Sequence, residues 1–231
     1  MISKELTLIL PTKNHEKLIS EKIEYVSEFL LQNFEKHEII IVSNGSREEN
    51  TNLIKELSIP NIVHLIYETS GKGFAVREGI KNSKYNFVLI CDSDFSVDIK
   101  FIKDFFKNGL PISEFVVGSR KIIGSFVEKS PFIRLISGGL FTFLTKYYLK
   151  IKISDTQCGF KLVDKTRFFN IDTYSSDDFF FDVELFILAT DLNLSISEVP
   201  VHYIHNNQTS VNLLSDSLRM FLKILRFKRL F

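Results

Sequence analysis

Cysteine is scarce in this chain of 231 residues: Cys91 and Cys158 are the only two, and they lie far apart in the sequence. Two thiols without a CxxC pair or a zinc-type spacing exclude a disulfide scaffold and a zinc module. Charges of the two signs nearly cancel, because 29 Lys and Arg residues face 28 Asp and Glu residues. The net charge therefore gives no general attraction to nucleic acid, and we expect no nucleic-acid partner.

Long apolar runs are also missing, since no uninterrupted run reaches the roughly 18–20 residues that a membrane-spanning helix needs. The first five residues lack the basic flank, apolar core and cleavage site of a signal peptide. We therefore expect a cytoplasmic protein that does not span a membrane. Hydrophobic residues still make up 45% of the chain, which is enough for a sizeable core.

Short β-branched runs alternate with amphipathic segments over the first two-thirds of the chain, as in βα units around a largely parallel sheet. Pro200 falls in the last predicted strand, which favours an edge position for that strand. We predict one α/β domain over residues 1–212 and a separate helix over residues 213–231. The predicted strands are 6–10, 38–42, 62–67, 87–91, 114–117 and 195–203, and the helices include 16–34, 48–57, 99–106 and 181–190.

Polar, turn-forming residues follow four of these strands, at 11–14, 43–46, 92–94 and 118–120. In open α/β sheets ligands bind outside the carboxyl ends of the strands, so these four turns should converge on one rim. Asp92 and Asp94 are the most informative of them, because alternate residues of an extended chain point the same way and can face one cation. The alternative for this Asp-x-Asp pair is a solvated turn without a ligand.

Three further segments carry residue types that suit a site. Gly71-Lys72-Gly73 precedes a helix and can present backbone N–H groups and an ammonium to phosphate, although a flexible helix entry explains it too. Residues 154–161 compress a carboxylate, an amide and a glycine into one loop. Asp182 and Glu184 lie in an apolar setting, where burial would raise their pKa values; they are candidate acid/base groups, or they orient the 154–161 loop or cap their own helix.

The order of these motifs resembles the family 2 glycosyltransferases of GT-A fold, especially the polyprenyl-phosphate glucosyl- and mannosyltransferases. The matching pieces are residues 8–14, 38–42, 45–46, 71–79, 92–94, 118–120, 155–161, 181–185 and 198–201. The resemblance implies a Rossmann-like nucleotide-diphospho-sugar transferase fold of three layers with a mostly parallel central sheet. It also implies a metal-dependent inverting enzyme that moves a sugar from a nucleotide-sugar donor to a dolichyl- or undecaprenyl-type phosphate.

The resemblance implies roles for individual residues as well. Asp92 and Asp94 would hold Mg²⁺ or Mn²⁺ against the donor diphosphate. Nucleotide-sugar binding falls to Pro11, Thr12, Asn14, Asn44, Lys72, Arg77, Asp92 and Ser93. Catalytic candidates are Asp94, Arg120, Asp155, Gln157 and Asp182. Two cations would gather the acceptor phosphate, Arg120 and Arg134; the alternative for Arg134 is a surface cation on a helix.

The sequence departs from the family pattern at two places. Ser43 and Asn44 stand where relatives usually carry two aspartates that help to hold the nucleoside, and His15 separates Asn14 from Glu16. The choice of nucleobase therefore stays open, and a catalytically inactive binding module is one alternative. A nucleotidyltransferase is another, but it would need an N-terminal Gly-rich loop that the chain lacks. A further alternative is the same fold acting on a sugar hydroxyl in polysaccharide or glycolipid assembly. That acceptor would require a general base, and Asp155 or Asp182 would be the candidate.

The C-terminal residues 217–231 place apolar side chains on one side of a helix and carry five Arg and Lys residues without an acidic one. Basic amphipathic helices favour an anionic membrane surface, so we expect a peripheral protein on the cytoplasmic face of a membrane. The alternatives are a helix docked on the domain or on a second copy, and homo-oligomerisation stays open. The aromatic stretch 131–149 either admits a polyprenyl chain or packs in the core.

Overall fold

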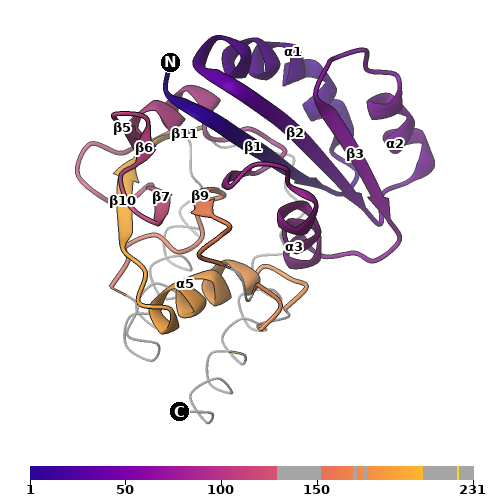
Figure 1. Cartoon of the computed structure of the whole chain (residues 1–231). Coiled ribbons are helices and arrows are strands. Elements are labelled where there is room, and N and C mark those ends of the chain that lie inside the picture. The colour runs from indigo at the N-terminus through magenta and orange to yellow at the C-terminus, as the bar shows by residue number, and fades with distance from the viewer. Residues whose placement is uncertain (129–151, 169–170, 174–175, 205–222, 224–231) are drawn as a thin grey trace.

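A seven-stranded sheet forms the centre of the computed structural model, in the order β10-β7-β9-β4-β1-β2-β3 (Figure 1). The structure describes residues 1–128, 152–168, 171–173, 176–204 and 223. Neighbouring strands are parallel except at β9, which runs antiparallel to β4 and β7. The predicted α/β class with a mostly parallel sheet is confirmed. The strands are β1 Ser3–Thr12, β2 Phe34–Asn44, β3 Ile62–Tyr67, β4 Phe87–Cys91, β7 Phe115–Ser119, β9 Phe160–Asp164 and β10 Ile196–Pro200.

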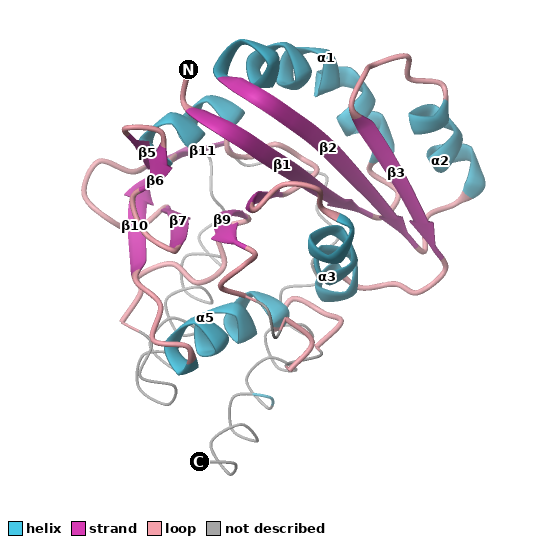
Figure 2. Ribbon diagram, viewed as in Figure 1, coloured by secondary structure: helices cyan, strands magenta, loops and turns pink. Residues whose placement is uncertain are grey.

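Helices cover both faces of the sheet (Figure 2). Strand β1 shows why: Leu8 and Leu10 pack in one buried cluster with α1, whereas Ile9 between them packs in the other with α3 and α5. Side chains alternate across a strand, so a run that is apolar at every position must be covered on both sides. The helices are α1 Glu16–Asn33, α2 Glu48–Lys55, α3 Lys72–Asn82 and α5 Phe181–Asp191, with a 3₁₀ helix, η1, at Ile99–Phe105.

The predicted strand 6–10 is longer in the structure, at Ser3–Thr12, and the predicted helix 99–106 is the 3₁₀ helix η1. Three further elements differ more strongly from the sequence prediction. Strand β2 begins at Phe34, directly after α1, because the Phe34 backbone is already extended. The segment before residue 162 was predicted as loop alone, but β9 pairs on both edges within the sheet. The predicted strand 195–203 is two strands: β10 pairs with β7 at the sheet edge, as Pro200 indicates, and β11 (His202–Ile204) pairs with β8 (Phe126–Glu128) in a second sheet.

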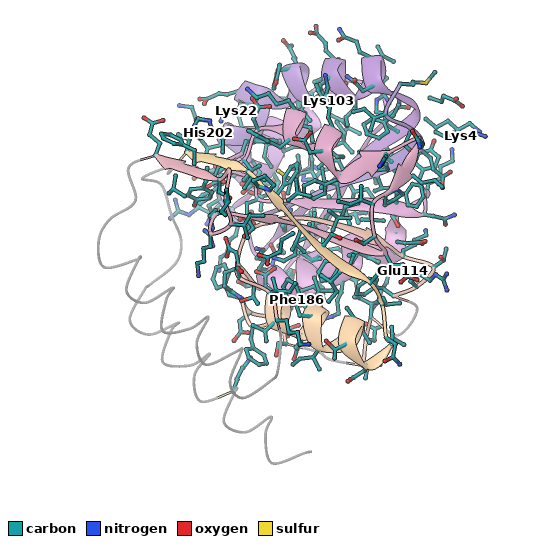
Figure 3. All side chains as sticks on the ribbon, turned by 90° about the vertical axis from the view of Figure 1, so that its left-hand side faces the viewer. Lys4, Lys22, Lys103, Glu114, Phe186 and His202 are labelled. Carbon is teal, nitrogen blue, oxygen red and sulfur yellow. The ribbon has the colours of Figure 1, made fainter. Side chains whose placement is uncertain are left out.

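The carboxyl ends of the parallel strands share one side of the molecule (Figure 3). Lys4, at the start of β1, and Glu114, just before β7, lie on the right of that view, whereas His202 and Lys22 lie on the left. A short hairpin of β5 (Phe106–Lys107) and β6 (Leu110–Pro111) completes the described strands. No helix among the described residues is both long and apolar enough to cross a bilayer.

Candidate active site

The loop after β4 carries the two aspartates, which are both partly exposed. The backbone N–H of Asp92 donates to the Gly159 carbonyl at 3.0 Å, so the loop is fixed against the start of β9. Asp94 accepts two hydrogen bonds, from the Ser96 amide at 2.9 Å and the Ser96 hydroxyl at 2.6 Å. Ser93 between the aspartates is buried. The loop therefore holds both carboxylates at the carboxyl end of β4.

Gly159 lies so close to Asp92 that a side chain at this position would have to displace the carboxylate. A Cβ atom at residue 159 would lie 1.8 Å from Oδ2 and 2.0 Å from Cγ of Asp92. Real Cβ atoms essentially never approach another heavy atom that closely, so the observed position of the Asp92 carboxylate depends on the glycine. This contact explains the glycine of the 154–161 loop.

Lys72 brings a buried positive charge to the same place. Its Nζ lies 2.9 Å from Oδ1 of Asp92 and 3.0 Å from Oδ2 of Asp182. Burial alone lowers a lysine pKa, but the charges of Asp182 and Asp92 outweigh it and raise the pKa of Lys72 above its usual value. Lys72 is therefore a permanent cation at the first residue of α3. The next amide, of Gly73, already donates to the Asp177 carbonyl at 2.8 Å.

Asp182 on α5 links Lys72 to a second lysine in the core. Nζ of Lys161, a fully buried residue on β9, lies 2.8 Å from Oδ1 of Asp182. Burial favours the neutral acid, but the charges of Lys161 and Lys72 prevail and lower the pKa of Asp182. The expectation that burial raises this pKa is wrong, because the sequence did not reveal the two lysines. Asp92, Lys72, Asp182 and Lys161 thus form a chain of alternating charges.

Glu184 follows the expected direction, since burial raises its pKa above the usual range. Its carboxylate accepts from the amide and hydroxyl of Ser176, at 3.0 and 2.7 Å, and these bonds only partly oppose the burial. Glu184 thus braces the 176–178 loop and does not join the charge chain.

Arg120, directly after β7, is held by a two-point ion pair. Its Nε lies 2.6 Å from Oδ2 of Asp155 and its Nη2 2.8 Å from Oδ1. Asp155 is 1% exposed; burial acts to raise its pKa, but the Arg120 charge and hydrogen bonds lower it to about 2. Glu198 on β10 fixes the loop by accepting the amides of Ser154 and Asp155 at 2.9 and 3.1 Å. The guanidinium is therefore oriented before any ligand arrives.

The rim at the ends of β1 and β2 carries uncharged amide side chains, from Asn14 and Asn44. Asn14, with a φ of 61°, accepts from the Arg47 amide at 2.9 Å and ties the first turn to α2. Asn44 is buried and donates to the Gly71 carbonyl at 2.7 Å. Asn44 therefore joins the end of β2 to Gly71, the residue before Lys72. Asn44 and Gly71 are almost thirty positions apart in the sequence.

Several buried polar atoms near this rim have no hydrogen-bond partner in the part of the chain that the structure describes. They include the hydroxyl of Thr12, which follows buried Pro11 at the end of β1, and both carboxylate oxygens of Glu16. The Nδ1 atom of His64 on β3 is another, while its Nε2 lies 2.9 Å from the Ser43 hydroxyl. Unpaired buried polar groups are rare in folded proteins, and each calls for an explanation. A polar ligand at the ends of β1 to β3 would supply one.

Three predicted site residues remain: Arg77, Arg134 and Gln157. Arg77 is 6% exposed and its guanidinium binds the Ser176 carbonyl at 2.9 Å and Asp177 at 2.5 Å, so it anchors the loop against α3. Arg134 lies outside the described residues. Gln157 stands beside Asp155, and its Nε2 is buried without a partner among the described residues.

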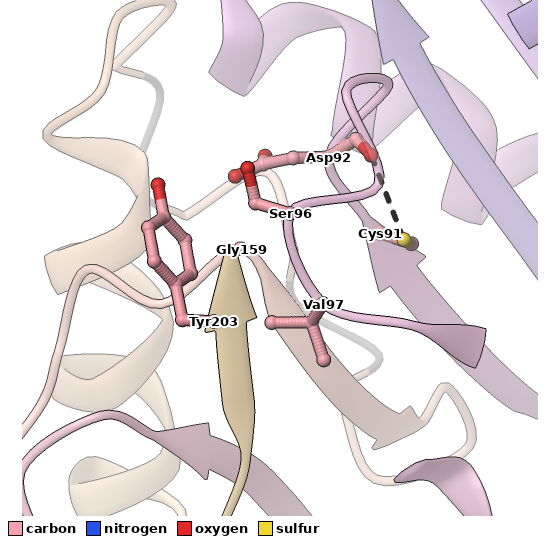
Figure 4. A pocket seen from close by; sticks show the side chains of 6 residues that line it. All are labelled: Cys91, Asp92, Ser96, Val97, Gly159 and Tyr203. Atoms are coloured by element: carbon pink, nitrogen blue, oxygen red, sulfur yellow. Dashed lines mark hydrogen bonds between the residues drawn. The ribbon is translucent and has the colours of Figure 1, made fainter. Parts of the chain in front are cut away.

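Tyr203 is the site residue that sequence reasoning missed. It lines a small pocket with Asp92, Ser96 and Gly159, among others, and Figure 4 shows its hydroxyl on the same side as the Asp92 carboxylate. The Arg120 guanidinium lies 5.0 Å from the centre of its ring. A tyrosine in a predicted edge strand carries no signal of this role, because the pairing of β11 with β8 places it.

The profile of glycosyl transferase family 2 matches residues 7–169, more than two-thirds of the chain. The chain belongs to this family. It is 30% identical to the dolichyl-phosphate beta-glucosyltransferase of Dictyostelium discoideum, over 96% of this chain and 73% of that protein. It is 31% identical to the Drosophila melanogaster enzyme of the same name, over 87% of this chain and 67% of that protein. The family 2 chain is thus a glycosyltransferase.

Solved structures place this family 2 chain in the GT-A fold. Glucosyl-3-phosphoglycerate synthase from Mycobacterium tuberculosis, in complex with UDP, superposes with a TM-score of 0.70 at 15% identity, over 97% of this chain and 80% of that one. Mannosyl-3-phosphoglycerate synthase from Rubrobacter xylanophilus gives a TM-score of 0.66 at 12% identity, over 97% of this chain and 73% of that one. The predicted fold is therefore confirmed.

Proposed function

We propose that this glycosyltransferase moves glucose from a nucleotide-sugar donor to a polyprenyl phosphate with inversion at the sugar carbon. The observation that carries the proposal is that both candidate general bases are bound by cations. Asp155 gives its two oxygens to Arg120, and Asp182 gives one oxygen each to Lys72 and Lys161. A sugar hydroxyl needs a base, whereas a lipid phosphate is already an anion and needs positive charge.

Two fixed cations serve the two substrates, one at the donor phosphates and one at the acceptor phosphate. Lys72 is held against Asp92, where the donor diphosphate would bind, and Arg120 packs on Tyr203, which lines the pocket beside Asp92. Both ammonium and guanidinium are ion-paired in advance, so they require little reorganisation as charge develops on the leaving diphosphate. We assign Lys72 to the donor phosphates and Arg120 to the acceptor phosphate, with Arg134 as a second acceptor cation.

Asp92 and Asp94 fit a divalent cation by their chemistry. Mg²⁺ commonly binds through one or two carboxylates together with substrate phosphates and water, and Mn²⁺ accepts the same hard oxygens. No group of three or more His, Cys, Asp or Glu side chains that could hold a metal ion occurs among the described residues. When bound, such an ion would neutralise the departing diphosphate. A structural relative from Mycobacterium tuberculosis binds Mn²⁺ and UDP.

The nucleoside end of the donor fits the rim at β1 to β3. Thr12 and Glu16 offer buried oxygens without protein partners, and a ribose presents hydroxyl groups that can donate to them. Asn44 at the end of β2 replaces an aspartate of the family pattern and retains a carbonyl oxygen as acceptor. We propose that these three residues, with Pro11 and Asn14 shaping the turn, hold the nucleoside.

Two parts of the proposed function involve a membrane: the lipid acceptor and the C-terminal residues 213–231. We propose that residues 213–231 form a basic helix that binds the cytoplasmic face of an anionic membrane. One of its residues, Lys223, contacts the domain: its Nζ lies 2.8 Å from Oδ2 of Asp178. This contact joins the tail to the loop that Arg77 and Glu184 brace from the other side.

One assay tests reaction class and donor together. Purified protein with Mn²⁺ and undecaprenyl or dolichyl phosphate is offered labelled UDP-glucose, with GDP-mannose for comparison. We expect label from UDP-glucose in the organic phase, its loss on chelation, and its loss in Asp94→Ala. The matched control is Asp104→Ala, which removes an exposed aspartate from η1. Label that reached only sugar hydroxyls, or full turnover by Asp94→Ala, would contradict the proposal.

A further inference from the structure

The small sheet of β8 and β11 has two different faces. Tyr203 points into the pocket beside Asp92, so its neighbours in the strand, His202 and Ile204, project from the opposite face because side chains alternate. Phe126 of β8 lies opposite His202, and their ring centres are 4.5 Å apart. One face of this sheet thus belongs to the active site. On the other face, His202 packs between Phe126 and Phe101 of η1, and Phe126 and Ile204 are exposed.

The outward face exposes two apolar side chains, Phe126 and Ile204, and Glu128 of β8 lies opposite Ile204 on the same face. Phe126 is 57% exposed and Ile204 is 54% exposed, while Ile123 in the turn before β8 is fully exposed. Isolated exposed apolar side chains need no explanation, but these three occur within two short segments that meet in space. We call Ile123, Phe126 and Ile204 the β8–β11 face.

This face is joined to the residue that the proposed function assigns to the acceptor phosphate. Arg120 packs on the ring of Tyr203, and Ile123 follows Arg120 by three residues. The Phe126 amide donates to the Val201 carbonyl at 3.2 Å, which fixes the start of β8 to the residue before β11. The acceptor cation and the apolar side chains therefore lie close together around the β8–β11 sheet.

We propose that the β8–β11 face is a membrane-contact surface that inserts into the bilayer carrying the lipid acceptor. The inference rests on the proposed function. Each methylene group of a lipid chain that is buried in a bilayer adds to the free energy needed to extract the lipid. A polyprenyl chain therefore stays in the membrane while its phosphate reacts. The phosphate then reaches Arg120 only if this part of the protein lies at the membrane surface.

The orientation agrees with the rest of the molecule. His202, on the same face, lies at the carboxyl-terminal side of the sheet, opposite Lys4 and Glu114 (Figure 3). Other exposed apolar residues lie at the far side: Leu31 near the end of α1, and Leu110 beside Gly109, whose carbonyl accepts from Ser3 at the start of β1. These residues are natural controls because they cannot reach a membrane that touches Arg120.

The test compares a face variant, Ile123→Ser/Phe126→Ser/Ile204→Ser, with a control variant, Leu31→Ser/Leu110→Ser. A third variant, Ile123→Asp, changes only a fully exposed side chain and so leaves folding unaffected. Binding is measured by flotation with neutral phosphatidylcholine vesicles, which lack the anionic charge that the basic tail is proposed to bind. Transfer is measured with a long polyprenyl phosphate in those vesicles and with water-soluble citronellyl phosphate, and thermal melting checks the fold.

We expect the face variant and Ile123→Asp to lose vesicle binding and transfer to the long acceptor, by about tenfold or more for the triple change. Transfer to citronellyl phosphate should persist, and the control variant should match wild type. Unchanged flotation would overturn the inference, as would equal loss with both acceptors in folded protein. A wild-type dimer that Ile123→Asp dissociates without altering flotation would overturn it too. Wild-type protein that glycosylates neither acceptor would instead refute the proposed function.

Discussion

Asp182→Asn is the substitution that probes the charge chain most directly. The change preserves size and shape but removes the negative charge that Lys72 and Lys161 share. Lys161 is 0% exposed, and its ion pair in the described structure is with Asp182. After the substitution, the Lys161 ammonium would remain in the core without a counter-charge.

The expected loss follows from that burial. Removing one partner of a buried ion pair costs about 3–5 kcal/mol, because the remaining charge is desolvated without compensation. In a domain of this size, 1 kcal/mol shifts the melting temperature by about 2–4 °C, so we expect Asp182→Asn to melt roughly 6–20 °C lower. The free energy of unfolding should fall by the same 3–5 kcal/mol or so in urea titrations at neutral pH.

Two further variants separate charge pairing from simple disruption. Glu184→Gln removes a buried carboxylate from the same helix, but its partner is the neutral Ser176, so we expect a loss of about 1 kcal/mol. Combining Asp182→Asn with Lys161→Met removes both charges and should recover a large part of the lost stability. The reasoning is refuted if Asp182→Asn costs no more than Glu184→Gln, or if Lys161→Met adds a further loss to it.

Three other predictions concern pH, sterics and thiol reactivity. Asp155 has its pKa lowered from 3.8 to about 2 by Arg120, and this difference corresponds to about 2 kcal/mol of stability that is present above pH 4 and lost as the pH falls toward 2. The stability gap between wild type and Asp155→Asn in urea should therefore shrink from pH 7 to pH 3, and a constant gap would contradict it. Gly159→Ala should displace the Asp92 carboxylate and reduce both Mn²⁺ binding and glucosyl transfer at least tenfold, whereas normal binding by calorimetry would show that the loop adapts. Burial raises the pKa of Cys158 to about 12, so this thiol should resist a disulfide reagent at pH 8 until urea unfolds the chain; rapid labelling of native protein would disprove its burial.

The sequence was sufficient for the order and type of most elements in the first half of the chain. Strands β3 and β4 match their predicted bounds, because each is a short run rich in β-branched, aromatic and other large apolar residues. It was less informative about β9 and β11. A segment that follows a polar loop becomes a strand only when β4 and β7 are both present to accept its hydrogen bonds.

The residues of the candidate active site also fall into those that the sequence identified and those that it did not. Motif spacing identified Asp92, Asp94, Lys72, Arg120 and Asp155 as candidates, and the structure brings all five to one side of the sheet. Motif spacing could not identify Tyr203 or Lys161. A tyrosine in a strand and a lysine beside a phenylalanine carry no local sign of the residues that they contact.

Local sequence thus determined where the strands end. It thereby also determined which polar residues lie on the rim, because parallel strands expose their carboxyl ends on one side of a sheet. Only the tertiary structure decided the charge state and partner of each group. Asp182 lies more than a hundred residues from Lys72 and 21 from Lys161, yet both lysines lie within 3.0 Å of it and lower its pKa against the effect of burial. Electrostatic interactions depend on distance in space, and no spacing along the chain encodes that distance.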